Sequence, residues 1–496
     1  MLDAFLAALG IILDFKMLLY LVLGTLTGYV VGFLPGLTGS VGMALLLPAT
    51  YGLNPFFAFS LLGGVMGASA IGGSVPAILI NTPGQPMNAA TSFDGYPMAK
   101  QGRAREALGA AAMASLVGAV LGLILLVAFI PFAAPIVLAL GPAEWFLLSV
   151  LGLTLIASVS EESMINGLIA GVLGLLLSFH GSNSVTGGIR YAFGITYLWD
   201  GIKFLPALMG VFAIAEMISL ATESSSVSER GDLSKGSVWT GIRAVFTNWK
   251  ITVQSSIIGV LIGAIPGVGG TVANFLAYSK ARQSSKDPQS FGKGNIQGVI
   301  ASEASNDAKD GGALMPLLAL GIPGSTSTAV LLGALTLHGI IPGQAMLTEH
   351  LDLTFVLILA RVGGGILAAS LGLFISTKMA KLTLLPTYIL APIVVLFIMI
   401  GAYGARLIVY DMFLTIGFGI LGYVMKKLDF PRIPLILGLI LGPIAESSFH
   451  TAMQFSGYSV SIFATRPICL FLLVLIFLSI VMPQWQAYKK RKAGVE

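Results

Sequence analysis

The chain has 496 residues, of which 56% are hydrophobic and only 10% are charged, and its mean hydropathy is +0.92. This composition exceeds what a soluble core needs, so it excludes an ordinary soluble globular protein. The net charge of +5 comes from basic residues spread over short loops, which excludes the clustered basic surface of a nucleic-acid-binding protein.

Long apolar runs follow one another along the chain, at 17–34, 108–130, 353–375 and 468–481 among others. A membrane-spanning helix needs about 20 apolar residues, so the sequence predicts an all-α polytopic membrane protein with about a dozen transmembrane helices. The 61 glycines are compatible with this class, because small residues let helices approach closely in lipid.

Two segments of the first half return in the second half. The stretch 32–41 contains Pro-Gly, and the similar stretch 263–272 follows 231 positions later (263 − 32). The stretch from Pro76 to Gly84 matches the stretch from Pro316 to Gly324, 240 positions later (316 − 76). Each half therefore contains two Pro-Gly breaks in apolar helical sequence. Such paired interruptions indicate broken or re-entrant helices around a transporter binding site.

Basic residues predict how the halves are oriented, because short cytoplasmic loops collect Lys and Arg. The tail 489–492 reads Lys-Lys-Arg-Lys, which places the C-terminus in the cytoplasm. The loop at 51–55 after the first break is uncharged, whereas the matching loop at 280–293 holds four basic residues. Matching loops thus face opposite sides, which predicts two repeats of inverted topology. The predicted parts are a first repeat (1–221), a cytoplasmic connector (222–250), a second repeat (251–430), and C-terminal helices with a basic tail (431–496).

The breaks suggest how an anion could be held. A broken helix exposes backbone N–H groups at its new N-terminus, where the helix dipole favours negative charge. The predicted substrate-binding residues, for a ligand that carries carboxylates, are Pro35, Gly36, Thr38, Ser40, Asn81, Thr82, Pro83, Gly84, Pro266, Gly267, Thr271, Asn274, Pro323, Gly324, Ser325, Thr326 and Ser327. The alternative is that the Pro-Gly pairs only kink the helices and that the hydroxyls bond to preceding carbonyls.

The segment 302–310 carries the densest oxygen ligands of the second half. Na⁺ or a coupling proton would need such groups, so the predicted coupling-ion residues are Ser302, Glu303, Asn306 and Asp307. The alternative is a solvated loop end in which Lys309 pairs with an aspartate. Arg361 is interpreted as a snorkelling interfacial anchor rather than as a counter-charge for an anion. Asp94 and His338 occupy corresponding loop positions after the breaks, where capping of helix ends explains them as well as a chemical role does.

Motifs for other activities are absent from the sequence. It has no Gly-x-x-x-x-Gly-Lys-Ser/Thr loop for a nucleotide, no His-Glu-x-x-His zinc motif and no Gly-x-Ser-x-Gly elbow, and its four histidines are scattered. We therefore expect no enzymatic activity and no cofactor. Transport must then be driven by an ion gradient or by another chain.

The ordered blocks at 32–41, 72–84, 93–100, 263–270 and 311–324 closely resemble the large membrane subunit of the tripartite tricarboxylate transporters. The resemblance implies a bacterial inner-membrane permease that takes up carboxylates with Na⁺ or protons. It also implies two partners, a small membrane subunit and a periplasmic solute-binding protein. The Pro-Gly breaks would form the substrate and ion sites. A stand-alone carrier or channel that needs no binding protein stays open as the alternative.

Overall fold

The computed structural model is built almost entirely of helices and describes residues 1–34, 37–158, 164–183, 187–222, 236–266, 269–379, 387–404 and 406–492. In the first half the α-helices are α1 (Leu2–Ile12), α2 (Phe15–Phe33), α3 (Gly39–Leu46), α4 (Pro55–Ile80), α5 (Ala89–Lys100), α6 (Ala104–Leu138), α7 (Pro142–Ser158), α8 (Met164–Ser178), α9 (Phe204–Leu208) and α10 (Ala215–Thr222). A short hairpin of β1 (Gly181–Ser182) and β2 (Ile189–Arg190) separates α8 from α9.

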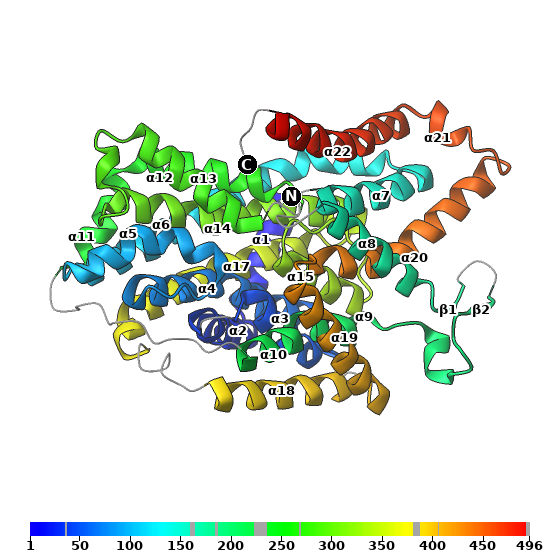
Figure 1. Cartoon of the computed structure of the whole chain (residues 1–496), viewed down its shortest axis with the longest axis horizontal. Helices are drawn as coiled ribbons and strands as arrows, with labels where there is room; N and C mark the ends of the chain where they lie inside the picture. Colours follow the sequence, from blue (N-terminus) through cyan, green and yellow to red (C-terminus); the bar gives the residue numbers. More distant parts are fainter. Residues whose placement is uncertain are drawn as a thin grey trace.

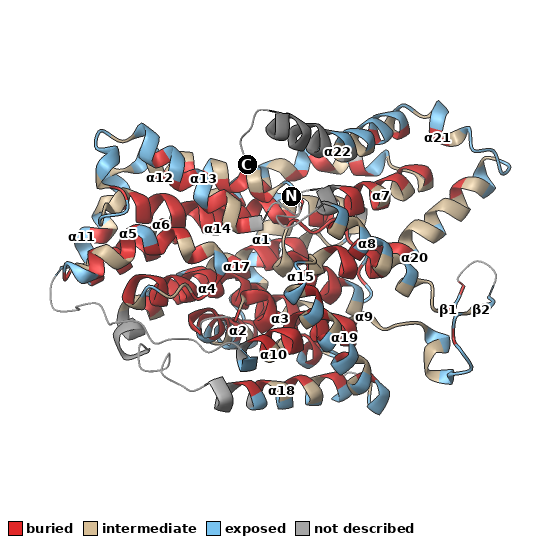
Figure 2. Ribbon diagram, in the orientation of Figure 1, coloured by how far each residue is buried: buried red, intermediate tan, exposed pale blue. Residues whose placement is uncertain are grey.

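In the second half the α-helices are α11 (Val238–Thr247), α12 (Trp249–Gly263), α13 (Gly269–Ser284), α14 (Ile296–Leu320), α15 (Thr326–Leu337), α16 (Gln344–Leu347), α17 (Leu351–Met379), α18 (Thr387–Gly404), α19 (Val409–Lys427), α20 (Arg432–Phe455), α21 (Ile462–Thr465) and α22 (Pro467–Lys492). Helices α4, α14 and α17 lie in the middle of the molecule, while α18, α21 and α22 lie at its rim (Figure 1). The central helices are mostly buried and the rim helices are largely exposed (Figure 2).

Six helices of the described residues are long and apolar enough to cross a membrane: α2, α4, α6, α17, α19 and α20. Helices α11 and α12 form a seventh candidate as a pair bent by 78°. The chain is therefore a multi-pass helical membrane protein, as the composition predicted. Several further apolar helices have only 10–17 residues, so the predicted total of about a dozen spans stays a prediction.

Local chemistry explains where the two central helices begin and end. The side chains of Asn54 and Asn295 accept hydrogen bonds from the second helical residues of α4 and α14 and thereby cap these helices. Asn81 and Gly321 end the same two helices in the left-handed conformation, with φ of 52° and 67°. Asparagine and glycine tolerate this conformation best. The identity of Asn81, predicted as a substrate ligand, is thus explained by its role at the helix end.

Rows of glycines at helix contacts, called glycine seams below, show that α2 packs on α4 in the way that α12 packs on α14. A Cβ atom on Gly28 would lie 2.7 Å from the Val65 Cα, and one on Gly259 would lie 3.0 Å from the Ser305 Cα. Gly259 and Ser305 are the residues 231 and 240 positions after Gly28 and Val65, so the sequence repeat recurs as the same helix contact. Close backbone approach is the usual role of glycine in membrane helix pairs.

The two halves also interlock. Helix α6 of the first half packs along α14, where Gly118 lies against the backbone of Ala304. Helix α17 of the second half packs along α4, where Gly364 lies against the backbone of Gly64. Each half thus places its long helix against the broken helix of the other half, which puts α4 and α14 at the centre.

Filling one seam is expected to destabilise the protein. A Gly28→Ala variant places a methyl group against the Val65 backbone, which cannot move aside without separating α2 from α4. Overpacking of this kind costs about 1–3 kcal/mol, so the variant should unfold at a lower temperature in detergent. Gly417→Ala in α19 is the matched control, since a Cβ atom there meets nothing within 4 Å. Equal melting temperatures for the two variants would contradict the seam.

Candidate functional site

The four Pro-Gly breaks meet in pairs beside the central helices. A Cβ atom on Gly84 would collide with the carbonyl oxygen of Gly32, and one on Gly324 would lie 2.7 Å from that of Gly263. The second contact is the repeat of the first, 231 and 240 residues later. Each half thus brings its own two breaks together. Of the predicted substrate residues, Pro35, Gly36 and Gly267 lie outside the described residues.

The first pair of breaks is bridged by Gln85, which the sequence analysis missed. Its Oε1 accepts a hydrogen bond from the backbone N–H of Gly39 at 3.3 Å, and its Nε2 donates to the Ser69 carbonyl at 2.6 Å. Thr38 and Ser40 hydrogen-bond to each other at 2.7 Å at the start of α3. The N-terminus of α3 therefore has protein partners of its own. A glutamine next to a Pro-Gly pair was the available signal.

The second pair of breaks differs in its polar contacts. Ser325 and Thr328 form a capping box at the start of α15, so capping explains these hydroxyls. Asn274, on α13, donates from Nδ2 to the Met87 carbonyl at 2.8 Å. This bond joins the third break to the second one across the two halves. Thr271 and Ser327 lie half-buried in the first turns of α13 and α15.

Glu303 is the centre of the predicted coupling group. Its side chain is fully buried on α14 and accepts hydrogen bonds from Ser74 of α4 at 2.7 Å, from Ser115 of α6 at 2.8 Å and from Thr91 of α5. Ser302, one residue earlier, lies 3.1 Å from the Thr91 hydroxyl. Three helices thus bring hydroxyl groups to one carboxyl group on a fourth helix.

Among the buried acidic side chains of the described residues, Glu303 differs in having hydroxyl groups alone as hydrogen-bond partners. The others have cations or backbone amides, as in the pairs Glu144–Arg466 at 2.5 Å and Glu216–Lys426 at 3.0 Å. A hydroxyl group can donate or accept, so these neighbours suit both a carboxylate and a protonated carboxylic acid. Oxygen atoms are also the ligands that hard cations take. The Glu303 environment therefore suits either coupling ion.

Asp94 shows the contrasting environment. Its Oδ1 accepts from the backbone N–H groups of Gly292, Gly294 and Asn295 at 2.8–2.9 Å, and its Oδ2 accepts from the Tyr278 hydroxyl at 2.8 Å. Backbone N–H groups only donate, so these partners require an acceptor at Oδ1. Asp94 thereby fixes the turn that leads into α14, in line with its predicted role at a helix end. His338 occupies the C-cap position of α15.

Arg361 lies in a buried charge network, so its interpretation as an interfacial anchor is wrong. The side chain is fully buried on α17, and its Nη2 donates to Asp307 Oδ1 at 2.7 Å and to Asp310 Oδ2 at 3.0 Å. Lys309 Nζ donates to Asp310 Oδ1 at 2.6 Å. Two cations thus balance two carboxylates. The alternative of a solvated loop end is wrong in its exposure, because 302–310 lies buried inside α14, but the pairing of Lys309 with an aspartate that it included is confirmed.

Several buried polar atoms in and around this network lack hydrogen-bond partners among the described residues. They are both amide atoms of Asn306, the Oγ of Ser305, the Oδ1 of Asn88 and Asn274, the Oδ2 of Asp307, and the Nε and Nη1 of Arg361. A buried polar group without a partner costs free energy, and such groups usually meet water, an ion or a ligand. The unpartnered groups lie on α13, α14, α17 and the turn at 86–88. This is the part of the molecule where the breaks converge.

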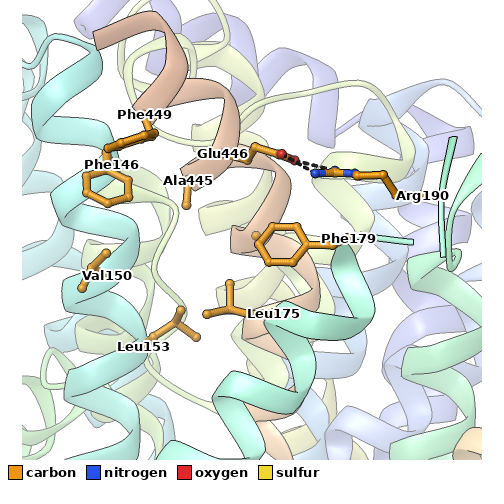
Figure 3. Close-up of a pocket in the computed structure, with 10 residues that line it drawn as sticks. Phe146, Val150, Leu153, Leu175, Phe179, Arg190, Ala445, Glu446 and Phe449 are labelled. Atoms are coloured by element: carbon orange, nitrogen blue, oxygen red, sulfur yellow. Dashed lines mark hydrogen bonds and ion pairs between the residues drawn. The ribbon is translucent and has the colours of Figure 1, made fainter. Parts of the chain in front are cut away.

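Outside the centre, the molecule holds an apolar cavity of about 370 Å³ between α7, α8 and α20. Figure 3 shows Val150, Leu153 and Leu175 at its base and the Arg190–Glu446 ion pair at its mouth. Because this pair is neutral and the walls are apolar, the cavity does not suit an anion. In the segment before α9, Tyr197 donates to Asp411 at 2.5 Å, and burial and this bond raise the pKa of the Tyr197 phenol.

Broken helices that converge on buried polar groups inside a multi-pass membrane protein define a membrane transport protein. The chain matches the model of the tripartite tricarboxylate transporter TctA family over residues 18–437. An uncharacterized 52.8 kDa protein in the TAR-I ttuC' 3' region of Agrobacterium vitis is 34% identical over 482 residues, which cover 95% of this chain and 94% of that protein. The chain therefore belongs to the tripartite tricarboxylate transporter TctA family.

A second similar protein of Agrobacterium vitis is an uncharacterized protein in the TAR-II ttuC' 3' region. It is 35% identical over 237 residues, which cover 48% of this chain and 98% of that protein. No solved structure matches the chain. Membership of a transporter family agrees with the absence of enzyme motifs from the sequence.

Proposed function

We propose that this chain is the permease subunit of a binding-protein-dependent secondary transporter that imports tricarboxylates or dicarboxylates across the bacterial inner membrane. The observation that carries the proposal is the convergence of the paired helix breaks on a buried polar centre, in a chain of this family. Helix N-termini at the breaks favour carboxylates through their dipoles, and Glu303 suits the coupling ion. Transport proceeds by alternating access, driven by a Na⁺ or proton gradient.

The proposed topology follows the charge distribution. The two halves are inverted repeats over 1–221 and 251–430, the connector 222–250 and the C-terminus lie in the cytoplasm, and 431–496 adds the last helices. The matched glycine contacts of α2 with α4 and of α12 with α14 support a repeat. The proposed partners are a small membrane subunit and a periplasmic solute-binding protein. The latter releases the carboxylate to the breaks.

The proposed site assigns the predicted residues to two roles. The substrate lies at the breaks, near Thr38, Thr82, Thr271 and Ser327 with their Pro-Gly pairs. The coupling ion lies at Glu303 with Ser302 and Asn306 beside it. Asp307 is already engaged with Arg361, which leaves Glu303 as the group that exchanges the ion. Glu303 is thus the residue with the largest expected effect on coupling.

Uptake of labelled citrate and succinate tests the proposal. Proteoliposomes that hold this chain and its small partner subunit should accumulate one of these carboxylates only with the binding protein and an inward Na⁺ or proton gradient. Accumulation without the binding protein would favour the alternative, a stand-alone organic-anion carrier or channel. Equal uptake with and without either gradient would contradict secondary active transport.

A further inference from the structure

Lys309 differs from its counterpart in the first half in a way that bears on the ligand. Ser69 of α4 and Lys309 of α14 are matching residues of the two halves. Ser69 lies against Gly39 in the first turn of α3, and Lys309 lies against Gly270 in the first turn of α13. A Cβ atom on Gly270 would collide with Lys309 Cε and would lie 3.5 Å from its Nζ. The repeat therefore replaces a small hydroxyl with a buried ammonium group.

The ammonium group of Lys309 pairs with Asp310 and also lies beside the N-terminus of α13. Lys309 has only about 5% of its surface exposed, and α13 is a 16-residue helix whose N-terminus carries partial positive charge. Cations are stabilised at helix C-termini, not at N-termini, so this arrangement favours a negative group beside both the ammonium group and the helix N-terminus. The N-terminus of α3 differs, since Gln85 already accepts from the Gly39 N–H.

Unpartnered donors beside Lys309 point independently to a ligand. Asn306 is fully buried and lies three residues before Lys309 on the same side of α14, and its Nδ2 and Oδ1 have no hydrogen-bond partner among the residues that the structure describes. Arg361, which also pairs with Asp310, is fully buried, and its Nε and Nη1 have no partner in the described part of the chain. Donors of this kind, next to an ammonium group, fit the oxygens of a carboxylate.

Of the two cations in the network, Lys309 can change partners without leaving a buried carboxylate unpaired, whereas Arg361 cannot. Asp307 has Arg361 as its cation, whereas Asp310 has both Arg361 and Lys309. If Lys309 leaves, Asp310 keeps Arg361. If Arg361 leaves, Asp307 loses its cation in a buried site, which is costly. Arg361 therefore positions both aspartates and releases Lys309 for a second anion.

We propose that Lys309, at the first turn of α13, binds a carboxylate group of the transported substrate, and that the Asp310 side chain neutralises Lys309 in the empty protein. The proposal rests on the proposed function and adds a substrate-binding cation to the break region. Substrate and Asp310 compete for the same ammonium group. Neutralising Lys309 should therefore weaken binding, and neutralising Asp310 should strengthen it.

Thermal unfolding of the purified full chain in detergent, titrated with citrate and with succinate, measures this binding without any partner subunit. The half-saturating citrate concentration should rise roughly tenfold or more in Lys309→Gln, because a charge-assisted bond is lost. The half-saturating citrate concentration should rise less in Lys309→Arg and should fall in Asp310→Asn. Lys426→Gln, which removes a lysine that pairs with Glu216 elsewhere, is the control and should leave it unchanged.

The outcomes separate the two proposals. A wild-type chain that responds to carboxylates, with the same half-saturating concentration in Lys309→Gln, overturns the role of Lys309 and leaves the transport proposal standing. If Lys309→Gln does not fold, an unchanged concentration in both Lys309→Arg and Asp310→Asn overturns it as well. A wild-type chain that neither binds nor takes up citrate or succinate contradicts the proposed function and the inference with it.

Discussion

A Glu303→Gln variant is expected to lose gradient-driven carboxylate accumulation, by at least about tenfold relative to wild type (1.4 kcal/mol in an equilibrium). Glutamine keeps the shape of the side chain but can neither carry a proton nor offer a charged oxygen to Na⁺. The hydroxyls of Ser74, Thr91 and Ser115 would then surround a group without a coupling role. The measurement is uptake by proteoliposomes of the complete transporter under an imposed Na⁺ gradient and, separately, a pH gradient.

Two comparisons make this result specific. Exchange of internal for external carboxylate, which needs no net ion movement, should persist in Glu303→Gln. Glu144→Gln is the matched control, since Glu144 is also fully buried but is paired with Arg466 at 2.5 Å. It should keep the response to both gradients even if its stability falls. Retained gradient-driven accumulation in Glu303→Gln would remove Glu303 from the coupling mechanism.

An Arg361→Met variant is expected to lose about 3–5 kcal/mol of unfolding free energy, the cost of leaving a buried carboxylate without its partner. Arg361 is fully buried and donates to both Asp307 and Asp310, so its removal leaves Asp307 without a cation. Methionine keeps much of the volume of the side chain and isolates the loss of charge. The melting temperature and the yield of monodisperse protein in detergent report this loss.

A second substitution distinguishes charge from packing. In the double variant with Arg361→Met and Asp307→Asn, the stranded charge is gone, and part of the lost stability should return. Arg190→Met is the control on a partly exposed pair, where the Arg190 side chain is 30% exposed and its bridge to Glu446 is about 2.7 Å. Such pairs contribute about 0–1 kcal/mol. Equal melting temperatures for the Arg361→Met and Arg190→Met proteins would contradict the stabilising role of the buried charge network.

The sequence was informative wherever structure depends on nearby residues. The apolar run at 17–34 corresponds to α2, and the run at 353–375 lies within α17. The positions of the Pro-Gly pairs also indicated where α4 and α14 end. Proline removes a backbone donor and glycine permits a positive φ, and both effects act on the neighbouring backbone. Matched spacing of the breaks also predicted which helices correspond in the two halves.

The polar centre could not be derived in the same way, because its contacts join distant segments. Glu303 receives hydroxyls from residues 188 to 229 positions away, and serine and threonine in membrane helices commonly bond to their own backbone instead. Ser74 does both, with bonds to the Ala70 carbonyl and to Glu303. The interpretation of Arg361 as an interfacial anchor fails for a related reason. Its depth follows from aspartates 51 and 54 positions earlier, which no local pattern reveals.

The interlocked halves impose an order on biogenesis. Helix α4 carries Gly64 on the face that meets Gly364 of α17, and these two residues are separated by 300 positions (364 − 64). At a synthesis rate of about 5–20 residues per second, α4 would wait roughly 15–60 s before its partner is made. During that time its glycine face must be covered by lipid or by a helper protein. Helix α17 thus completes, late in synthesis, a packing interface that α4 opens early.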